Sequence, residues 1–176
     1  MKFYEAKTQK HLQKIAAWAT RQQEVNLSML CWSCRHKADL KHFKQLLTNP
    51  EGHLACVEDD AGNIKGVYYF EIRDPSRNKI DTPIMTRPAT IIDKTEWDTG
   101  SAMFTIAFFR WLARHGYETY GATKGEFYAI EKIMNISQKA FADYITITSI
   151  QPPPQPEMGK VYFFTMDLKK FAESSL

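Results

Sequence analysis

The sequence predicts an α/β protein built on a twisted, mixed and largely antiparallel sheet of about six or seven strands, with helices on both faces. Three observations predict it. Strand and helix patterns alternate along the whole chain, and three successive strand patterns are joined only by turns. A helix that is apolar on almost every side lies between two further strand patterns. A helix with so little polar surface belongs in the interior, packed on a sheet and covered on its other side.

The N-terminal quarter predicts one strand and two helices. Residues 2–6 alternate as a strand, and Thr8 is placed to cap the helix that follows. That helix carries apolar residues at helical spacing, namely Leu12, Ile15, Ala16 and Trp18. A second helix is expected over residues 38–47, where lysines occupy the side opposite the apolar residues, and the turn formed by residues 49–52 ends it.

Three strands follow in succession. Residues 53–58 alternate as a strand, residues 60–63 form a strong turn, and residues 65–72 make the return strand. A second turn over residues 74–78 leads to a third extended segment. Short turns of this kind join antiparallel neighbours, so this part of the sheet is expected to be antiparallel.

The central stretch of the chain runs from Ala89 to Thr123. It predicts a strand over residues 89–92, a charged loop, a helix over residues 101–115 and a strand over residues 117–122. Gly116 suits the left-handed position that ends many helices. A strand, a buried helix and a second strand in this order predict a right-handed crossover, which makes the two strands parallel neighbours.

The remaining residues predict one helix and two strands. The helix is expected over residues 126–136, with an extension toward Tyr144. The strands are expected over residues 144–150 and 161–167, separated by a proline-rich loop at residues 151–156.

Composition limits the functional classes. The chain has 176 residues, 24% charged residues and a net charge of +3, which fits one globular domain spanning residues 1–176. The small basic excess disfavours nucleic acid as a partner. No apolar run is long enough for a membrane span, and the polar N-terminus lacks a signal peptide, so we expect a cytoplasmic protein with no membrane partner.

The three cysteines are expected to be free thiols in a reducing compartment. Cys31 and Cys34, with His36 nearby, have spacing compatible with half of a zinc site, which His42, His53 or Cys56 could complete. Structural zinc sites usually contain two tight ligand pairs, and the second pair is absent from the sequence. A redox role for Cys31 and Cys34 would need a preceding strand, which the pattern does not clearly provide. We therefore expect packing cysteines and no metal.

The order of elements, together with a short motif, resembles the acetyl-CoA-dependent N-acetyltransferase superfamily, GNAT. The family motif is an apolar strand, a short loop, Arg or Gln, two residues, Gly, one residue, and Gly or Ala. On this sequence Ile91 and Ile92 fall at the strand end and Trp97 at the Arg/Gln position, while the remaining positions are Gly100, Ser101 and Ala102. The order of elements covers nearly the whole chain, and the motif matches it at one glycine.

The resemblance implies binding of acetyl-CoA. In the family, the strand backbone bonds the pantetheine arm, which places it at Ile91 and Ile92 here. Backbone N–H groups at the helix start hold the pyrophosphate, which implies that it lies over the amides of Thr99, Gly100, Ser101 and Ala102. The sequence departs from the family at Trp97, and the carboxylates of Glu96 and Asp98 add negative charge beside the anion site, offset nearby only by Lys94. The competing interpretation is that Asp98 or Thr99 simply caps a core helix.

Two candidate catalytic residues follow, one from the resemblance and one from its position at the end of the strand. Family members often carry a Tyr in the next helix that protonates the departing thiolate. Ile130 falls at that position here, and Tyr128 lies two residues earlier, so Tyr128 is the candidate acid if the helix starts differently. Asp93, at the end of the strand, is the candidate base that deprotonates an amine.

The predicted function is acetyl transfer from acetyl-CoA to a small-molecule or protein amine, by direct attack of the amine on the thioester. The alternative is a GNAT-like domain that has lost coenzyme binding and acts as a binding or interaction module. A homodimer is left open. The sequence does not identify the acceptor.

Overall fold

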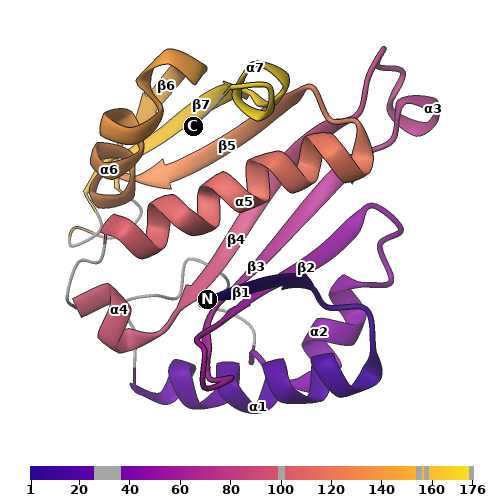
Figure 1. Cartoon of the computed structure of the whole chain (residues 1–176), viewed down its shortest axis with the longest axis vertical. Helices are drawn as coiled ribbons and strands as arrows, with labels where there is room; N and C mark the ends of the chain where they lie inside the picture. The colour runs from indigo at the N-terminus through magenta and orange to yellow at the C-terminus, as the bar shows by residue number, and fades with distance from the viewer. Residues whose placement is uncertain (26–36, 99–101, 154–155, 157–158, 175–176) are drawn as a thin grey trace. The chain divides into compact units, whose positions relative to one another are not determined.

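The computed structural model describes residues 1–25, 37–98, 102–153, 156 and 159–174 (Figure 1). Its strands are β1 (Lys2–Glu5), β2 (Gly52–Glu58), β3 (Ile64–Arg73), β4 (Ile84–Ile92), β5 (Lys124–Ile130), β6 (Ile145–Gln151) and β7 (Val161–Asp167). Its helices are α1 (Gln9–Val25), α2 (Leu40–Leu46), α3 (Pro75–Asn78), α4 (Lys94–Asp98), α5 (Ala102–Tyr120), α6 (Glu131–Phe141) and α7 (Leu168–Ala172), with a 3₁₀ turn at Ala142–Tyr144.

The strands form one seven-stranded sheet in the order β1-β2-β3-β4-β5-β7-β6. Strands β1 and β2, β2 and β3, β5 and β7, and β6 and β7 pair antiparallel. Strands β4 and β5 are parallel, with Ile84–Thr86 beside Lys124–Glu126. The predicted fold class, a mixed and largely antiparallel sheet with helices, is therefore confirmed.

The chain divides into two compact units. Unit 1 comprises Met1–Glu71 and Pro88–Ser101, and unit 2 comprises Ile72–Arg87 and Ala102–Leu176. Strands β3 and β4 each contribute residues to both units. The expectation of a single domain over residues 1–176 stays a prediction.

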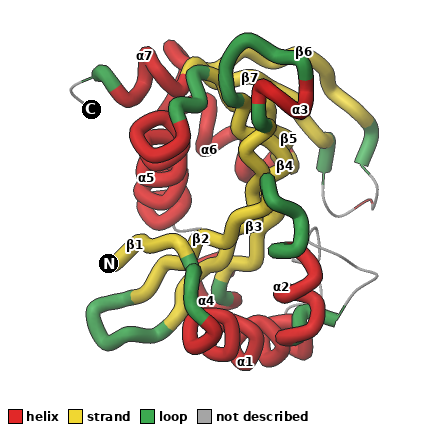
Figure 2. Tube along the Cα trace, turned by 90° about the vertical axis from the view of Figure 1, so that its right-hand side faces the viewer, coloured by secondary structure: helices red, strands yellow, loops and turns green. Residues whose placement is uncertain are grey.

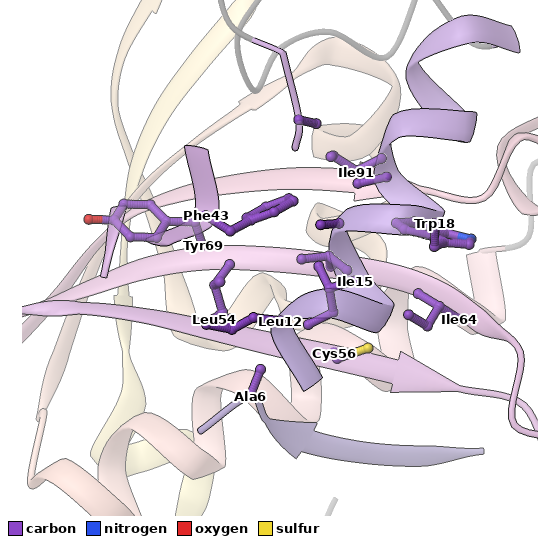
Figure 3. Close-up of a cluster of buried hydrophobic side chains, with 14 residues drawn as sticks. Ala6, Leu12, Ile15, Trp18, Phe43, Leu54, Cys56, Ile64, Tyr69 and Ile91 are labelled. Atoms are coloured by element: carbon purple, nitrogen blue, oxygen red, sulfur yellow. The ribbon is translucent and has the colours of Figure 1, made fainter. Parts of the chain in front are cut away.

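The core of unit 1 lies between α1 and the strands β2 and β3. The helix residues Leu12, Ile15 and Trp18 point toward Leu54, Cys56 and Ile64 on the strands (Figure 3). The complete cluster is Ala6, Leu12, Ile15, Ala16, Trp18, Ala19, Ala38, Phe43, Leu54, Cys56, Ile64, Val67, Tyr69 and Ile91. The 3.6-residue spacing along α1 predicted this face correctly.

Helices α1 and α2 of unit 1 each begin beside a polar residue that caps them. The backbone N–H of His11 donates to Thr8 Oγ1 at 3.2 Å, which confirms the predicted cap of α1. The N–H of His42 donates to Asp39 Oδ1 at 2.9 Å and caps α2. Each cap satisfies one of the N–H groups that a helix start leaves without a partner.

The core of unit 2 is aromatic. Figure 2 shows α5, α6 and α7 gathered on one side of β5 and β7. The ring of Phe109 on α5 lies 5.4 Å from Phe127 on β5 and 5.4 Å from Phe141 on α6. Phe141 also meets Phe171 of α7 at 5.6 Å in an edge-to-face arrangement. Such geometries are favoured for aromatic pairs and tie the three helices to this part of the sheet.

Helix α5 runs through Gly116 to Tyr120, so the predicted helix stop and the predicted strand at residues 117–122 are wrong. The reason is tertiary. A Cβ atom on Gly116 would lie 3.0 Å from Met85 Sδ and 3.6 Å from Leu168 Cδ1. Glycine is present because the helix backbone approaches β4 and α7 closely there, and the left-handed turn falls at Gly121 (φ 68°) instead.

The segment after α5 also differs from the prediction at its start. Residues 124–130 form β5, and the helix begins at Glu131 rather than at residue 126. Burial alternates along β5, with Gly125, Phe127 and Ala129 buried and Lys124 and Tyr128 exposed. This period of two belongs to a strand that has one covered face. The later strands β6 and β7 lie where the sequence predicts them.

Candidate coenzyme and catalytic site

The predicted coenzyme strand is the last part of β4. Its final residues Ile91 and Ile92 are both buried, at 5% and 3% exposed. Immediately after them, the backbone N–H of Asp93 donates to the carbonyl of Lys65 at 2.9 Å. The strand end is therefore held within unit 1 by core packing and by a bond to β3.

Asp93 is anchored through both of its carboxylate oxygens. Its Oδ1 accepts from the Thr95 N–H at 3.0 Å, the bond that caps the start of α4. Its Oδ2 accepts from Gln22 Nε2 at 3.1 Å. Asp93 is thus a positioned, half-buried carboxylate rather than a solvated one. Its role as a general base stays a prediction.

Gln22, near the end of α1, is the residue that sequence reasoning missed here. Its amide nitrogen binds Asp93, and its Oε1 accepts from the Lys94 N–H at 3.0 Å. One amide side chain therefore bridges the carboxylate and the first backbone N–H of α4. A separation of 71 residues along the chain left no local pattern that could have indicated this contact.

Lys65 is the second contributor that the sequence did not reveal. Its Nζ lies 3.7 Å from Glu96 Oε1, with both side chains about one quarter exposed (24% and 26%). The ammonium offsets one of the two carboxylates that the sequence places beside the anion site. Lys94 is therefore not the only cation near Glu96.

The helix-start residues of the motif are described only in part. Trp97 lies in α4 rather than in a loop, and Ala102 is the first residue of α5. The side chain of Trp97 and the predicted residues Thr99, Gly100 and Ser101 lie outside the described residues. The predicted helix start near Gly100 agrees with α5, which continues for 19 residues.

Tyr128 occupies a different element from the one expected. It lies on β5, whereas Ile130 is the last strand residue and precedes the first turn of α6. The Tyr128 side chain is among the exposed large hydrophobic residues, at 38%, and its ring lies 6.0 Å from Phe163 of β7. The expected position on a helix is wrong, and the proton-donor role stays a prediction.

A buried polar cluster lies beside α1 in unit 1. Glu58 Oε1 accepts from Tyr4 OH and from Lys14 Nζ, both at 2.6 Å. Burial alone would raise the pKa of Glu58, but the hydrogen bonds from Lys14 and Tyr4 outweigh it and lower the pKa. Desolvation by burial, with hydrogen bonds to Cys56 and Glu58, raises the pKa of Tyr4. The phenol and the ammonium both donate to the same carboxylate, so we assign the cluster to structure.

The cysteine predictions are tested only at Cys56. That thiol is free and buried, and desolvation raises its pKa to about 11, so it is a poor nucleophile. Cys31, Cys34 and His36 lie outside the described residues. Within the described ranges, no three His, Cys, Asp or Glu side chains are grouped to hold a metal ion, and no helix could cross a membrane.

Comparison with known proteins supports the fold. No family model matches the chain, and no curated protein matches it in sequence. Solved structures match over almost its full length. A spermidine N-acetyltransferase from Vibrio cholerae in complex with CoA and spermine has a TM-score of 0.68 at 10% identity, covering 97% of this chain and 96% of that chain.

Two further structures agree. A ribosomal-protein-S5-alanine acetyltransferase from Vibrio fischeri has a TM-score of 0.65 at 11% identity, covering 94% of this chain and 92% of that chain. An acetyltransferase of the GNAT family from Streptococcus pneumoniae has a TM-score of 0.61 at 11% identity, covering 93% and 98%. The chain therefore has the GNAT fold. At such identities the likeness establishes the fold alone.

Proposed function

We propose that this chain is an N-acetyltransferase that moves an acetyl group from acetyl-CoA to an amine. The observation that carries the proposal is the GNAT fold over nearly the full length of the chain, shared with several acetyltransferases, one of them in complex with CoA. The proposed coenzyme residues are the ones that the motif indicates, from Ile91 to Ala102.

The coenzyme would lie along the segment that joins β4 to α5. The pantetheine arm bonds the backbone at Ile91 and Ile92, and the pyrophosphate is held by the amides from Thr99 to Ala102. A helix start offers N–H donors and the positive end of the helix dipole to an anion. The 19-residue α5 supplies that field, and Lys65 supports the proposal by offsetting the charge of Glu96.

The reaction needs a proton acceptor and a proton donor. The neutral amine nitrogen attacks the thioester carbonyl carbon, and the C–S bond breaks. The attack leaves the nitrogen positively charged. In the proposed mechanism, Asp93 takes the extra proton from that nitrogen, and Tyr128 gives a proton to the departing thiolate. A carboxylate has about four lone-pair directions, and the bonds to Gln22 and Thr95 occupy two, so Asp93 retains accepting capacity.

The acceptor is proposed only as an amine, of a small molecule or of a protein. The similar structures include an enzyme named for spermidine and one named for an alanine of a ribosomal protein. Both candidates therefore belong in the first test panel, as a polyamine and as a peptide with an N-terminal alanine. We propose a cytoplasmic location on the composition alone.

Calorimetric titration with acetyl-CoA, followed by a mass-spectrometric assay on the amine panel, tests the proposal. Binding and acetylation are expected in the parent protein. Gly100→Glu should abolish binding because it adds bulk and negative charge where the phosphates lie. Gln138→Glu adds the same charge at an exposed position of α6 and should leave binding unchanged. A folded parent that does not bind acetyl-CoA would instead support a GNAT-like domain without coenzyme.

A second variant measures the charge environment. Glu96→Gln removes a carboxylate and releases Lys65 from its ion pair. Binding should tighten by about 0.5–1 kcal/mol at low salt, and the gain should shrink as salt is added, because the charges are partly exposed. A gain that does not depend on salt would contradict an electrostatic origin.

A further inference from the structure

The last turn of α1, which carries Gln22, is held by the backbone of a buried residue. Thr20 Oγ1 donates to the Ala38 carbonyl at 3.1 Å, and the Ala38 N–H donates to Gln23 Oε1 at 2.7 Å. Ala38 is fully buried and belongs to the apolar cluster of unit 1. Both backbone groups of Ala38 are therefore hydrogen-bonded to this turn, which gives the Gln22 side chain an ordered support.

Matched spacing along α1 and β4 brings Gln22 beside Asp93. Trp18 of α1 and Ile91 of β4 belong to the same buried cluster (Figure 3). Gln22 follows Trp18 by four residues, a rise of about 6 Å along a helix. Asp93 follows Ile91 by two residues, about 6.6 Å along an extended chain. The packing that buries Trp18 and Ile91 therefore also sets Gln22 and Asp93 at hydrogen-bond distance.

The Gln22 amide suits its two partners because it can donate and accept at once. Its Nε2 donates to Asp93 Oδ2 at 3.1 Å, and its Oε1 accepts from the Lys94 N–H at 3.0 Å. Lysine or arginine could donate to the carboxylate but could not accept from the N–H, and glutamate could accept but could not donate. Reversing the amide would set its oxygen against a carboxylate oxygen, so the two partners also fix its orientation.

The bonds of Gln22 and Asp93 hold the start of α4. This helix has five residues, and a helix so short is not stable through its own hydrogen bonds. The N–H groups of Lys94 and Thr95, at its start, have no partners within the helix. They donate instead to Gln22 Oε1 and Asp93 Oδ1. The placement of Asp93 and of the start of α4 is therefore set from α1.

We infer that Gln22 is a positioning residue of the proposed reaction and acts through Asp93. Gln22 fixes Asp93 Oδ2 and the Thr95 N–H fixes Oδ1, so the remaining lone pairs of the carboxylate have set directions. Proton transfer depends on this orientation, because the acceptor must lie within hydrogen-bond reach of the amine nitrogen. The inference rests on the proposed function, in which Asp93 takes the proton.

Turnover of Gln22→Ala, measured with acetyl-CoA and the best amine of the panel, tests the inference. The kcat should fall about tenfold or more because Asp93 loses the bond that orients it, while KM for acetyl-CoA should change by less than about threefold. Gln13→Ala removes the same amide from an exposed position of α1 and should leave both constants unchanged. A Gln22→Ala variant that keeps the parent kcat overturns the inference.

Exchanging the two side chains separates the hydrogen bonds from the carboxylate. In the double variant Gln22→Glu, Asp93→Asn, the new amide can donate to the new carboxylate, which still accepts from the Lys94 N–H. Hydrogen exchange at Lys94 and Thr95 should be fast in Gln22→Glu alone and should return to the parent rate in the double variant. The kcat of the double variant should stay low, because position 93 no longer carries a proton acceptor. Fast exchange in the double variant, or full turnover there, overturns the inference.

Failure of this inference can be told from failure of the proposed function. A parent protein that acetylates no amine overturns both. A parent that is active, with a Gln22→Ala variant that is equally active, overturns only the positioning role and leaves the proposed function standing.

Discussion

The interiors of the two units hold their elements together in different ways. Unit 1 buries charged and polar groups beside its apolar cluster. They include the Glu58 carboxylate with Tyr4 and Lys14, and Glu5 bonded to His53 Nδ1 at 2.9 Å. Unit 2 joins its helices and strands chiefly through phenylalanine rings. The stability of unit 1 should therefore depend on pH, whereas unit 2 should respond to side-chain volume.

The difference has a physical cause in each unit. A buried carboxylate remains charged only when its donors are in place, so removing one donor costs more than a surface pair would. A phenylalanine has no such requirement, but the packed rings around it cannot collapse to fill its volume. Substitutions at five residues, ordered by the size of the expected effect, test this comparison.

Phe141→Ala should have the largest effect. Phe141 is 1% exposed and contacts Phe109 and Phe171 at ring distances of 5.4 and 5.6 Å. Truncation leaves a cavity in unit 2 and should lower the free energy of unfolding by about 3–5 kcal/mol, measured by denaturant titration. Phe141→Leu, which refills much of the space, should cost clearly less. Equal losses for the two variants would show that ring packing is not what stabilises this site.

Glu58→Gln should destabilise unit 1 by about 1–2 kcal/mol at pH 7. The loss is smaller than for a fully buried pair because the Lys14 side chain is 46% exposed and solvent screens it. The pKa of Glu58 is lower in the folded protein than the ordinary value of 4.5 that it has in the unfolded chain. The Glu58 carboxylate therefore contributes its full stabilisation above pH 4.5, and that stabilisation is lost as the pH falls through the lowered folded-state pKa. Unfolding curves of parent and variant should therefore converge in acid.

Lys14→Met, alone and combined with Glu58→Gln, completes a double-mutant cycle for this pair. The double variant should lose less than the sum of the two single variants. A difference between parent and Glu58→Gln that stays constant from pH 7 to pH 3 would contradict the charge assignment.

Gly116→Ala should have a smaller effect and lower the free energy of unfolding by about 1 kcal/mol. Alanine favours the helix by about 1 kcal/mol, but the new methyl group must displace Met85 Sδ, which lies 3.0 Å from the Cβ position. Met85→Val has its own cost because Met85 is fully buried. Relative to that single variant, adding Gly116→Ala should cost little, because valine removes the sulfur atom. Thermal unfolding measures both. A loss that persists in the double variant would assign it to the backbone rather than to Met85.

Gln22→Ala should have the smallest global effect and lower the free energy of unfolding by about 0.5 kcal/mol, because it removes hydrogen bonds at a half-buried site where water can replace them. Faster hydrogen exchange at the amides of Lys94 and Thr95 is the more sensitive measurement. Gln22→Glu should do more damage than Gln22→Ala, since it sets a second carboxylate beside Asp93. If the two variants behave alike, the bond to Asp93 contributes little.

Local patterns in the sequence determined the main architecture. The strand pattern of residues 161–167 and the helical spacing of Leu12, Ile15 and Trp18 predicted β7 and the buried face of α1 correctly. These patterns succeed because burial repeats every two residues in a strand and every 3.6 residues in a helix, so it is visible in residues that are close together in the sequence. The same reasoning failed for residues 126–130, where a one-sided strand was taken for the start of a helix.

Contacts between distant residues were decided only by the tertiary structure. Gly116 has the sequence signature of a helix end, yet glycine is needed there because Met85 and Leu168 lie close to the backbone of α5. Asp93 was predictable as a carboxylate at a strand end, but its partner Gln22 lies 71 residues away, and Lys14 lies 44 residues from Glu58. No local sequence pattern predicts such pairs, because the two residues interact and stabilise the protein only when packing brings their segments together.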